Sequence, residues 1–184
     1  MVNADVVFAF FTVIFGFIGA MRGWVREIIA TASLILAIFV LNQFGEILAG
    51  FAPDQSPAGA TARFAVKAVP FLVIAFFGYL GPAVVRNRFS NTARGRIEEG
   101  IISFLCGGLN GFLIFSTLAY LAWQAQILGG APFPATDNQP LFVPPAGGWE
   151  NFFWIKNSAF LFFSGTVLIV VLVAVFLFLI VVII

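Results

Sequence analysis

The chain has 184 residues, of which 61% are hydrophobic and only 9% are charged, and its mean hydropathy is +1.07. A soluble domain of this size needs more charge on its surface, so this composition excludes an ordinary water-soluble protein and predicts a membrane protein. Nine Lys and Arg against eight Asp and Glu give a formal net charge of +1, which offers no support for binding nucleic acid or an acidic substrate.

The first apolar segment runs from Val6 to Met21 and is at the short end of what crosses a hydrocarbon core of about 30 Å. Asn3 and Asp5 precede it and are suited to capping the first turn of a helix. Because the segment lacks a basic region before it and Arg22 follows it, we expect a retained membrane helix and not a cleaved signal peptide.

A second apolar segment follows almost at once, from Ile28 to Phe44. Only the residues from Arg22 to Glu27 separate the two segments, and Gly23 interrupts the apolar pattern between them. This short connection predicts a tight helical hairpin, with one continuous kinked helix as the alternative geometry.

A third apolar segment, Phe64 to Val85, follows a loop predicted between Gly45 and Ala62 from its Gly, Pro, Ser, Asp and Gln content. Pro70 lies inside this segment and predicts a kink or a locally loosened backbone. Lys67, near its start, is expected to extend toward the lipid headgroups.

The stretch from Arg86 to Glu99 is the most charged in the chain, with four arginines and two glutamates, and is expected to lie in water or among headgroups. The fourth apolar segment, Ile101 to Trp123, carries a glycine patch that includes Gly107 and Gly111 at the spacing of a smooth helix face. Asn110 lies within that patch, so we expect its amide to bond to another helix.

The remainder of the chain divides into a loop, an aromatic cluster and a last apolar run. Residues Gly129 to Gly148 have too many prolines and glycines for a regular element and predict an outer loop. Trp149, Trp154 and Lys156 follow, and we expect them to act as anchors at the membrane interface. The run from Phe160 to Ile184 is apolar throughout and long enough for a fifth span.

These segments predict an all-α polytopic membrane protein with about five transmembrane helices. The expected organisation is a four-helix membrane domain over residues 1–128, an outer loop and interfacial segment over 129–158, and an additional helix over 159–184. Six arginines then fall on one side and three basic residues on the other, so the positive-inside rule places the N-terminus outside. The inner group is Arg22, Arg26, Arg86, Arg88, Arg94 and Arg96, and the outer group is Arg63, Lys67 and Lys156.

The chain contains no histidine, and Cys106 is its one cysteine. The usual ligands for zinc, haem and iron–sulfur clusters are therefore missing, as is the commonest general base, so we expect no cofactor, no metal site and no catalysis. Within the predicted spans no acidic residue is placed to relay protons or bind cations.

Two groups of residues are candidates for interaction sites. Small residues and one amide form the first group, which we interpret as packing surfaces inside the monomer, with an oligomer interface as the alternative: Gly16, Gly19, Gly23, Gly107, Gly108, Asn110 and Gly111. Charged residues form the second, interpreted as topology determinants and lipid contacts: Arg22, Arg26, Glu27, Arg86, Arg88, Arg94 and Arg96. For Arg22, Arg26 and Glu27 the alternative is a buried ion pair that holds the hairpin against the Arg86–Glu99 stretch.

Three features together resemble the bacterial colicin V production protein family. They are the turn from Arg22 to Glu27 (Arg-Gly-Trp-Val-Arg-Glu) after Asn3, Asp5 and Gly19, the basic stretch before the fourth helix, and the glycine-rich run from Gly107 to Gly111. The resemblance covers roughly the first two-thirds of the chain, and the outer loop and fifth apolar segment are additions to it. It implies a four-helix protein of the bacterial cytoplasmic membrane, linked to production or secretion of a peptide toxin.

Three functions remain open on the sequence. The first is a non-enzymatic membrane protein of the colicin V production type, with a role in peptide-toxin secretion or envelope maintenance. The second is an accessory subunit of a larger energy-converting or secretory membrane complex, and the third is a small oligomeric channel or transporter. Membrane lipid is the expected partner in every case, with further membrane protein subunits or a second copy of the chain as alternatives.

Overall fold

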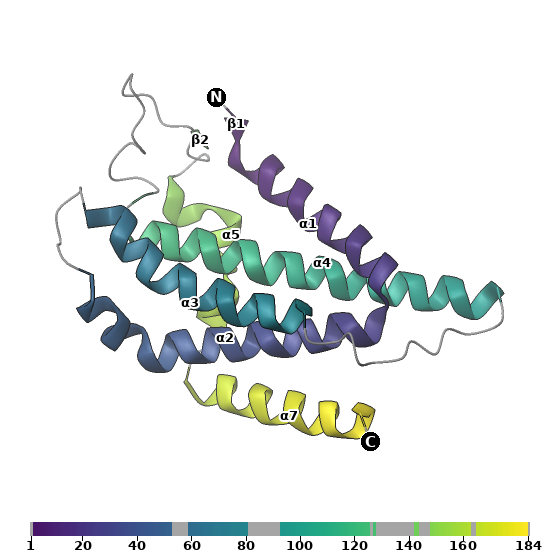
Figure 1. Cartoon of the computed structure of the whole chain (residues 1–184). Coiled ribbons are helices and arrows are strands. Elements are labelled where there is room, and N and C mark those ends of the chain that lie inside the picture. Colours follow the sequence, from purple (N-terminus) through teal and green to yellow (C-terminus); the bar gives the residue numbers. More distant parts are fainter. Residues whose placement is uncertain are drawn as a thin grey trace.

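The computed structural model describes residues 2–52, 59–80, 93–125, 127, 142–143, 148–162 and 165–183. Its main elements are α1 (Ala4–Arg22), α2 (Trp24–Gly50), α3 (Ala60–Leu80) and α4 (Ala93–Gln124). All four helices are long and apolar enough to cross a membrane. The prediction of an all-α polytopic membrane protein is therefore confirmed (Figure 1).

The helices extend beyond the apolar segments that predict them. Helix α2 continues through Gly45 to Gly50, and α4 begins at Ala93, inside the charged stretch. Helix α3 also continues through Pro70. Within the stretch from Arg86 to Glu99, residues 93–99 are thus helical, and residues 86–92 lie outside the described part of the chain. Hydropathy marks where lipid begins, whereas backbone hydrogen bonding lets a helix continue into the polar layer.

The connection between α1 and α2 is a single residue, Gly23, with φ 93° and ψ 148°. Such a positive φ is readily adopted by glycine and rarely by other residues. The turn is as short as the hairpin prediction requires, but the two helices diverge from it (Figure 1). Helix α1 packs mainly on α4, and α2 packs mainly on α3, so the bundle consists of two helix pairs joined where α2 meets α4.

The last part of the chain is broken into short elements: the 3-10 helix η3 (Trp149–Asn151), α5 (Phe153–Lys156), α6 (Ala159–Phe162) and α7 (Gly165–Ile183). Helices α5 and α6 lie mainly on α4, and α7 lies along α2. The direction changes by 69° between the segment Phe153–Leu161 and the segment Gly165–Leu177. The described parts of the apolar run from Phe160 to Ile184 are therefore not one straight helix. Among the described residues, four helices are long and apolar enough to cross a membrane, or five spans if the bent pair crosses as one.

Two short strands connect the N-terminus to the predicted outer loop. Strand β1 (Val2–Asn3) pairs in parallel with β2 (Phe142–Val143), with Val2 opposite Phe142. The other residues between 129 and 147 lie outside the described part of the chain. The pairing puts residues 2–3 and 142–143 at the same end of the bundle, as the alternation of spans requires.

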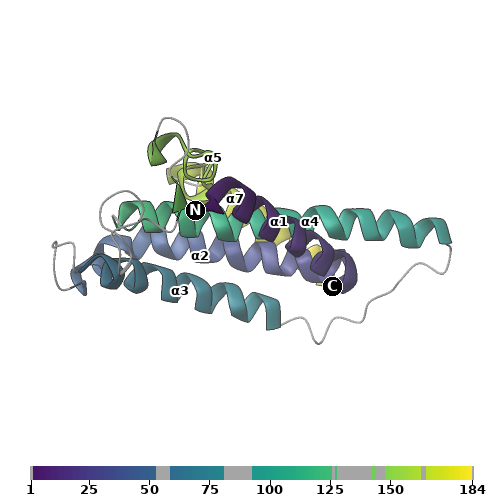
Figure 2. The same ribbon diagram turned by 90° about the horizontal axis from the view of Figure 1, so that it is seen from above.

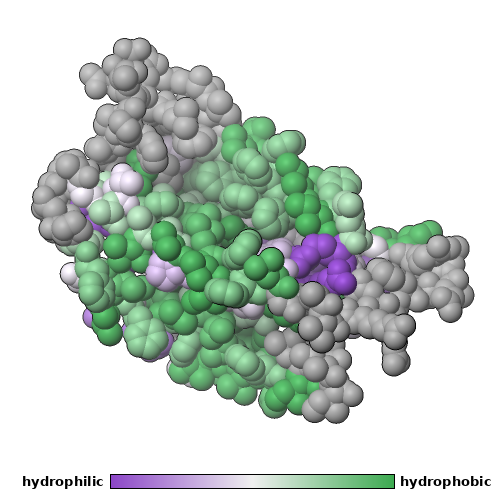
Figure 3. All heavy atoms as spheres, viewed as in Figure 1, coloured by the Kyte–Doolittle hydropathy of each residue, from purple (hydrophilic) through white to green (hydrophobic). Residues whose placement is uncertain are grey.

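The core lies where α2 meets α3 and α4, and its largest fully buried apolar side chains there are Leu34, Ile38, Leu41, Phe71 and Leu121. Large apolar side chains also cover the outside of the helices; examples are Phe10, Phe17, Phe76, Phe77 and Val170, each at least 60% exposed. The face in Figure 3 is accordingly mostly hydrophobic, with its strongest hydrophilic patch near the end of α1. An exposed surface of this kind is stable in lipid and not in water.

Candidate functional site

The corner between α1 and α2 brings together five polar residues from all four long helices: Arg22, Glu27, Thr31, Tyr79 and Asn110. We call this set the corner cluster. Arg22 is the last residue of α1, and Glu27 lies in the first turn of α2. A carboxylate in the first turn and an arginine in the last turn both interact favourably with the helix dipole, so each charge is placed well by its own helix.

The centre of the cluster is an ion pair between Arg22 and Glu27. Arg22 Nη1 donates to Glu27 Oε1 at 2.7 Å, and the two side chains are 20% and 1% exposed. A carboxylate this deeply buried is stable only when it is paired and hydrogen-bonded. The arginine, which is less buried, therefore neutralises the one fully buried charge among the described residues.

Asn110 of α4 completes the coordination of Glu27. Its amide Nδ2 lies 2.9 Å from the second carboxylate oxygen, Oε2, and 2.9 Å from the Glu27 backbone oxygen. The Thr31 hydroxyl lies 2.7 Å from Asn110 Oδ1 and 2.9 Å from the Glu27 backbone oxygen, and it donates to one of them at a time. The expected cross-helix bond of Asn110 is thus present, with its partner on α2.

Arg22 also reaches the end of α3. Its Nη2 donates to the backbone oxygen of Tyr79 at 2.9 Å, and its guanidinium carbon lies 4.5 Å from the centre of the Tyr79 ring. Carbonyl groups in the last turn of a helix lack partners within the helix, so this bond satisfies one of them. The Tyr79 hydroxyl is buried and has no hydrogen bond within the described part of the chain.

The bonding of the cluster indicates what it does chemically. Both carboxylate oxygens of Glu27 accept hydrogen bonds, and Arg22 and Asn110 are engaged through their donors. Opposite charges cancel at the site, so it has no net charge with which to attract an ion. The arrangement joins helices: within the described residues the buried ion pair contacts α3 and α4. Whether it also holds the hairpin against the Arg86–Glu99 stretch stays a prediction, because residues 86–92 lie outside the described part of the chain.

The predicted glycines lie mostly where α1 crosses α4. A Cβ atom on Gly19 would be 2.7 Å from the Cα atom of Gly107, and one on Gly111 would be 2.7 Å from the Cβ atom of Phe15. Gly16 lies against the Phe104 ring in the same interface. Of the remaining two, Gly23 forms the corner, and a Cβ on Gly108 would meet no atom within 4 Å.

The other predicted interaction residues are placed less uniformly. Arg26 is half-buried, and its Nε has no partner within the described residues. Arg86 and Arg88 lie outside the described residues, and Arg94 and Arg96 lie in the first turn of α4, where the side chains are not described.

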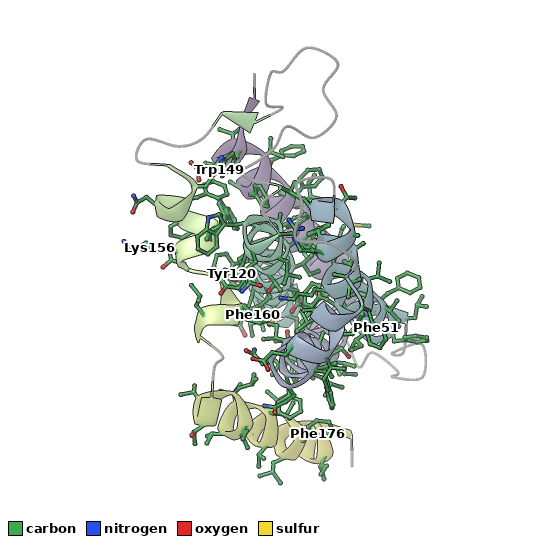
Figure 4. All side chains as sticks on the ribbon, turned by 90° about the vertical axis from the view of Figure 1, so that its left-hand side faces the viewer. Phe51, Tyr120, Trp149, Lys156, Phe160 and Phe176 are labelled. Carbon is green, nitrogen blue, oxygen red and sulfur yellow. The ribbon has the colours of Figure 1, made fainter. Side chains whose placement is uncertain are left out.

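The three predicted interfacial anchors also differ from one another. Lys156 is exposed and points away from the helices, as Figure 4 shows. Trp149 is half-buried and packs against Phe152. The side chain of Trp154 is only 6% exposed and packs between Phe8 and Phe112, so it belongs to the core, and its role as an anchor at the membrane interface stays a prediction.

Three residues of the corner cluster and of the helix contacts were not predicted from the sequence. Thr31 lies one helical turn after Glu27, so its position on the same face was available from the helical period. Tyr79 gave no such signal, because its contact with Arg22 joins residues 57 positions apart. Gly78, which allows α3 to approach the Ser33 side chain of α2, is not among the small residues that the sequence predicted to form packing surfaces.

Long apolar helices, an apolar exterior and a polar cluster that bonds the helices to one another define a multi-pass membrane protein. The sequence model of the family described as Colicin V production protein matches residues 4–161, and the chain belongs to this family. The match extends past the first two-thirds of the chain and includes the predicted outer loop, and α7 begins after it. Neither the curated proteins nor the solved structures gave a match.

Proposed function

We propose that the protein is a non-enzymatic component of the bacterial cytoplasmic membrane, with its N-terminus outside, that supports the production or secretion of a peptide toxin or maintains the envelope that the toxin crosses. The observation that carries this proposal is the family match over residues 4–161. The role in toxin production comes from the description of the family, and the membrane setting comes from the four long apolar helices.

The structure supports a role exerted through helix and lipid contacts. The corner cluster uses its charges to bond α1, α2, α3 and α4 to one another, and the exposed faces of those helices are apolar. Such a protein interacts with other molecules mainly through the apolar outer faces of its helices. Membrane lipid is then the first partner.

A deletion and complementation experiment tests this proposal. The gene is deleted in a cell that makes a colicin V-type peptide, and the peptide is measured by immunoassay in the medium and inside the cells. Entry of a membrane-impermeant dye measures envelope integrity in parallel. We expect the deletion to lower the peptide in the medium or to raise dye entry, and the wild-type gene and Glu46→Gln, an exposed change on α2, to restore both. Unchanged secretion and unchanged dye entry would refute the proposal.

A second function, an accessory subunit of a larger energy-converting or secretory membrane complex, is favoured by one observation. Helix α7 lies beyond the family match and buries Leu168 on α2, while Val170 and Leu177 on other faces are 61% and 59% exposed. Purification in gentle detergent followed by mass measurement separates the candidates. A fixed stoichiometry with other proteins supports the subunit, a homo-oligomer supports a channel or transporter, and the bare monomer supports the first proposal.

A further inference from the structure

The bundle divides into two helix pairs, each held together by close backbone packing. In the first pair, α1 and α4 meet through Gly19 and Gly107, and a Cβ on Gly107 would lie 2.8 Å from the Cα atom of Gly19. In the second, Gly78 of α3 fits against Ser33 of α2. The helices after α4 are also divided between the two pairs: α5 and α6 pack mainly on α4 of the first pair, and α7 packs on α2 of the second. Figure 2, viewed from above, shows α2 and α3 side by side and α1 crossing α4.

The polar bonds between these two pairs occur at both ends of the bundle. At one end the corner cluster joins Arg22 and Asn110 of the first pair to Glu27, Thr31 and Tyr79 of the second. Gly23 makes a one-residue covalent link between the pairs at the same corner, and the chain also passes between the pairs from α3 to α4 and from α6 to α7.

At the other end, two basic residues of α3 bond to the end of α4. Arg63 Nη2 donates to the backbone oxygen of Ala125 at 3.1 Å, and Lys67 Nζ donates to Gln124 Oε1 at 3.2 Å. We call these four residues the far clasp. The Gln124 amide donates in turn to the Tyr120 hydroxyl, and the Tyr120 ring stacks on Phe160 of α6. Both residues are labelled in Figure 4.

The two sets of bonds differ in strength because they differ in burial. The corner cluster holds a carboxylate that is 1% exposed, and breaking it leaves an unpaired charge away from water. The bond between Lys67 and Gln124 is exposed, where water replaces it at little cost. The bond from Arg63 to Ala125 is part-buried, but breaking it leaves no buried carboxylate unpaired. Between the two ends the pairs meet through the apolar core of α2 and α4, where side chains can shift against one another without leaving a polar group unpaired. The corner is therefore the more strongly bonded end of the bundle, and the far clasp is the end that opens more easily.

We infer that the protein contains a hinge: the pair α1–α4 rocks against the pair α2–α3 about the corner cluster and Gly23, and the bundle opens and closes at the far clasp. Movement of packed bodies about a terminal residue that accepts an unusual φ is a common mode of conformational change. Helix α1 has 19 residues, so a rotation of about 10° at the corner moves its far end by about 5 Å. This inference concerns the fold and does not rest on the proposed function.

Distances between spin labels in the full chain, reconstituted in lipid nanodiscs with Cys106→Ala, test the hinge. One label pair joins the two bodies at the far end, at Val6 of α1 and Ile47 of α2, which are 63% and 61% exposed. A second pair, Ile47 and Val69, lies within the body α2–α3 and reports on general loosening. The test variant combines Arg63→Ala with Lys67→Ala, and Lys156→Ala, an exposed change on α5, is the matched control.

We expect the test variant to shift the Val6–Ile47 distances by about 5 Å or to add a second, longer population. The Ile47–Val69 distances should stay unchanged, and the Lys156 variant should match the wild type. A Val6–Ile47 distribution identical to that of the wild type would overturn the hinge. Equal broadening of both label pairs would overturn it as well, because it would indicate a loosened bundle. Loss of folding in the test variant would also contradict the inference, since the far clasp would then be essential to the fold.

Discussion

Replacing Glu27 by glutamine tests the corner cluster most sharply, because it changes one atom of the carboxylate and keeps its size. Glu27 accepts from Arg22 at one oxygen and from Asn110 at the other. A glutamine has one acceptor and one donor at these positions, so its NH₂ group must face either Arg22 or Asn110, both of which also donate. The variant loses the ion pair and places two donors against each other.

The size of the effect follows from burial. Removing one partner of a buried ion pair costs about 3–5 kcal/mol when the remaining charge stays buried. Arg22 is 20% exposed, which lets water solvate part of its charge, so we expect the Glu27→Gln variant to lose about 2–3 kcal/mol of unfolding free energy. Since 1.4 kcal/mol is a factor of ten, this loss lowers the folding equilibrium constant by about 30- to 150-fold.

Unfolding of the purified protein in mixed micelles, followed by far-ultraviolet circular dichroism as the fraction of dodecyl sulfate rises, measures this loss. Glu46→Gln is the matched control, because Glu46 lies exposed on the same helix and its replacement should change stability by less than about 0.5 kcal/mol. Equal unfolding midpoints for the two variants would show that the Glu27 bonds do not stabilise the bundle.

The same unfolding assay tests two further contacts. Gly19→Leu should cost more than about 2 kcal/mol, because the new side chain would meet the backbone of Gly107, whereas Gly108→Leu enters open space and should cost less than about 1 kcal/mol; similar losses would refute the glycine interface. Trp154→Ala should cost about 3–5 kcal/mol and Phe153→Ala, at 56% exposure, about 1 kcal/mol or less, and the reverse order would place Trp154 at the lipid interface after all.

Hydropathy and glycine spacing were enough to predict the helices and part of their packing. Each apolar run from Val6, Ile28, Phe64 and Ile101 became a helix, because a chain in lipid must satisfy its backbone hydrogen bonds within the segment. The spacing from Gly107 to Gly111 predicted a smooth face, and that face contacts α1.

Other features depended on tertiary contacts that a pattern along the chain does not contain. The change of direction between Phe153–Leu161 and Gly165–Leu177 falls in a run that is apolar on both sides, so hydropathy gave no signal for it. Trp154 has the composition of an interfacial residue, and only its neighbours Phe8 and Phe112, from two other helices, make it a core residue.

Some members of the corner cluster could be predicted from the sequence, but the bonds between them could not. Arg22 and Glu27 stood out because charges next to an apolar run need an explanation, and Asn110 stood out because it lies among glycines. That these residues bond to one another, and that Tyr79 joins them, depends on the angle at Gly23 and on the register of α1 against α4. Both are set by packing between residues distant in sequence.

The measurement that tests the central claim most directly is the sidedness of single cysteines in intact cells. In a Cys106→Ala chain, a cysteine at position 94 or at position 137 is exposed to a membrane-impermeant maleimide before and after the membrane is permeabilised. A multi-pass protein with its arginines in the cytoplasm should be labelled at position 137 in intact cells and at position 94 only after permeabilisation. Labelling of position 94 alone in intact cells would invert the topology, and labelling of both positions before permeabilisation would contradict a chain that crosses the membrane between them.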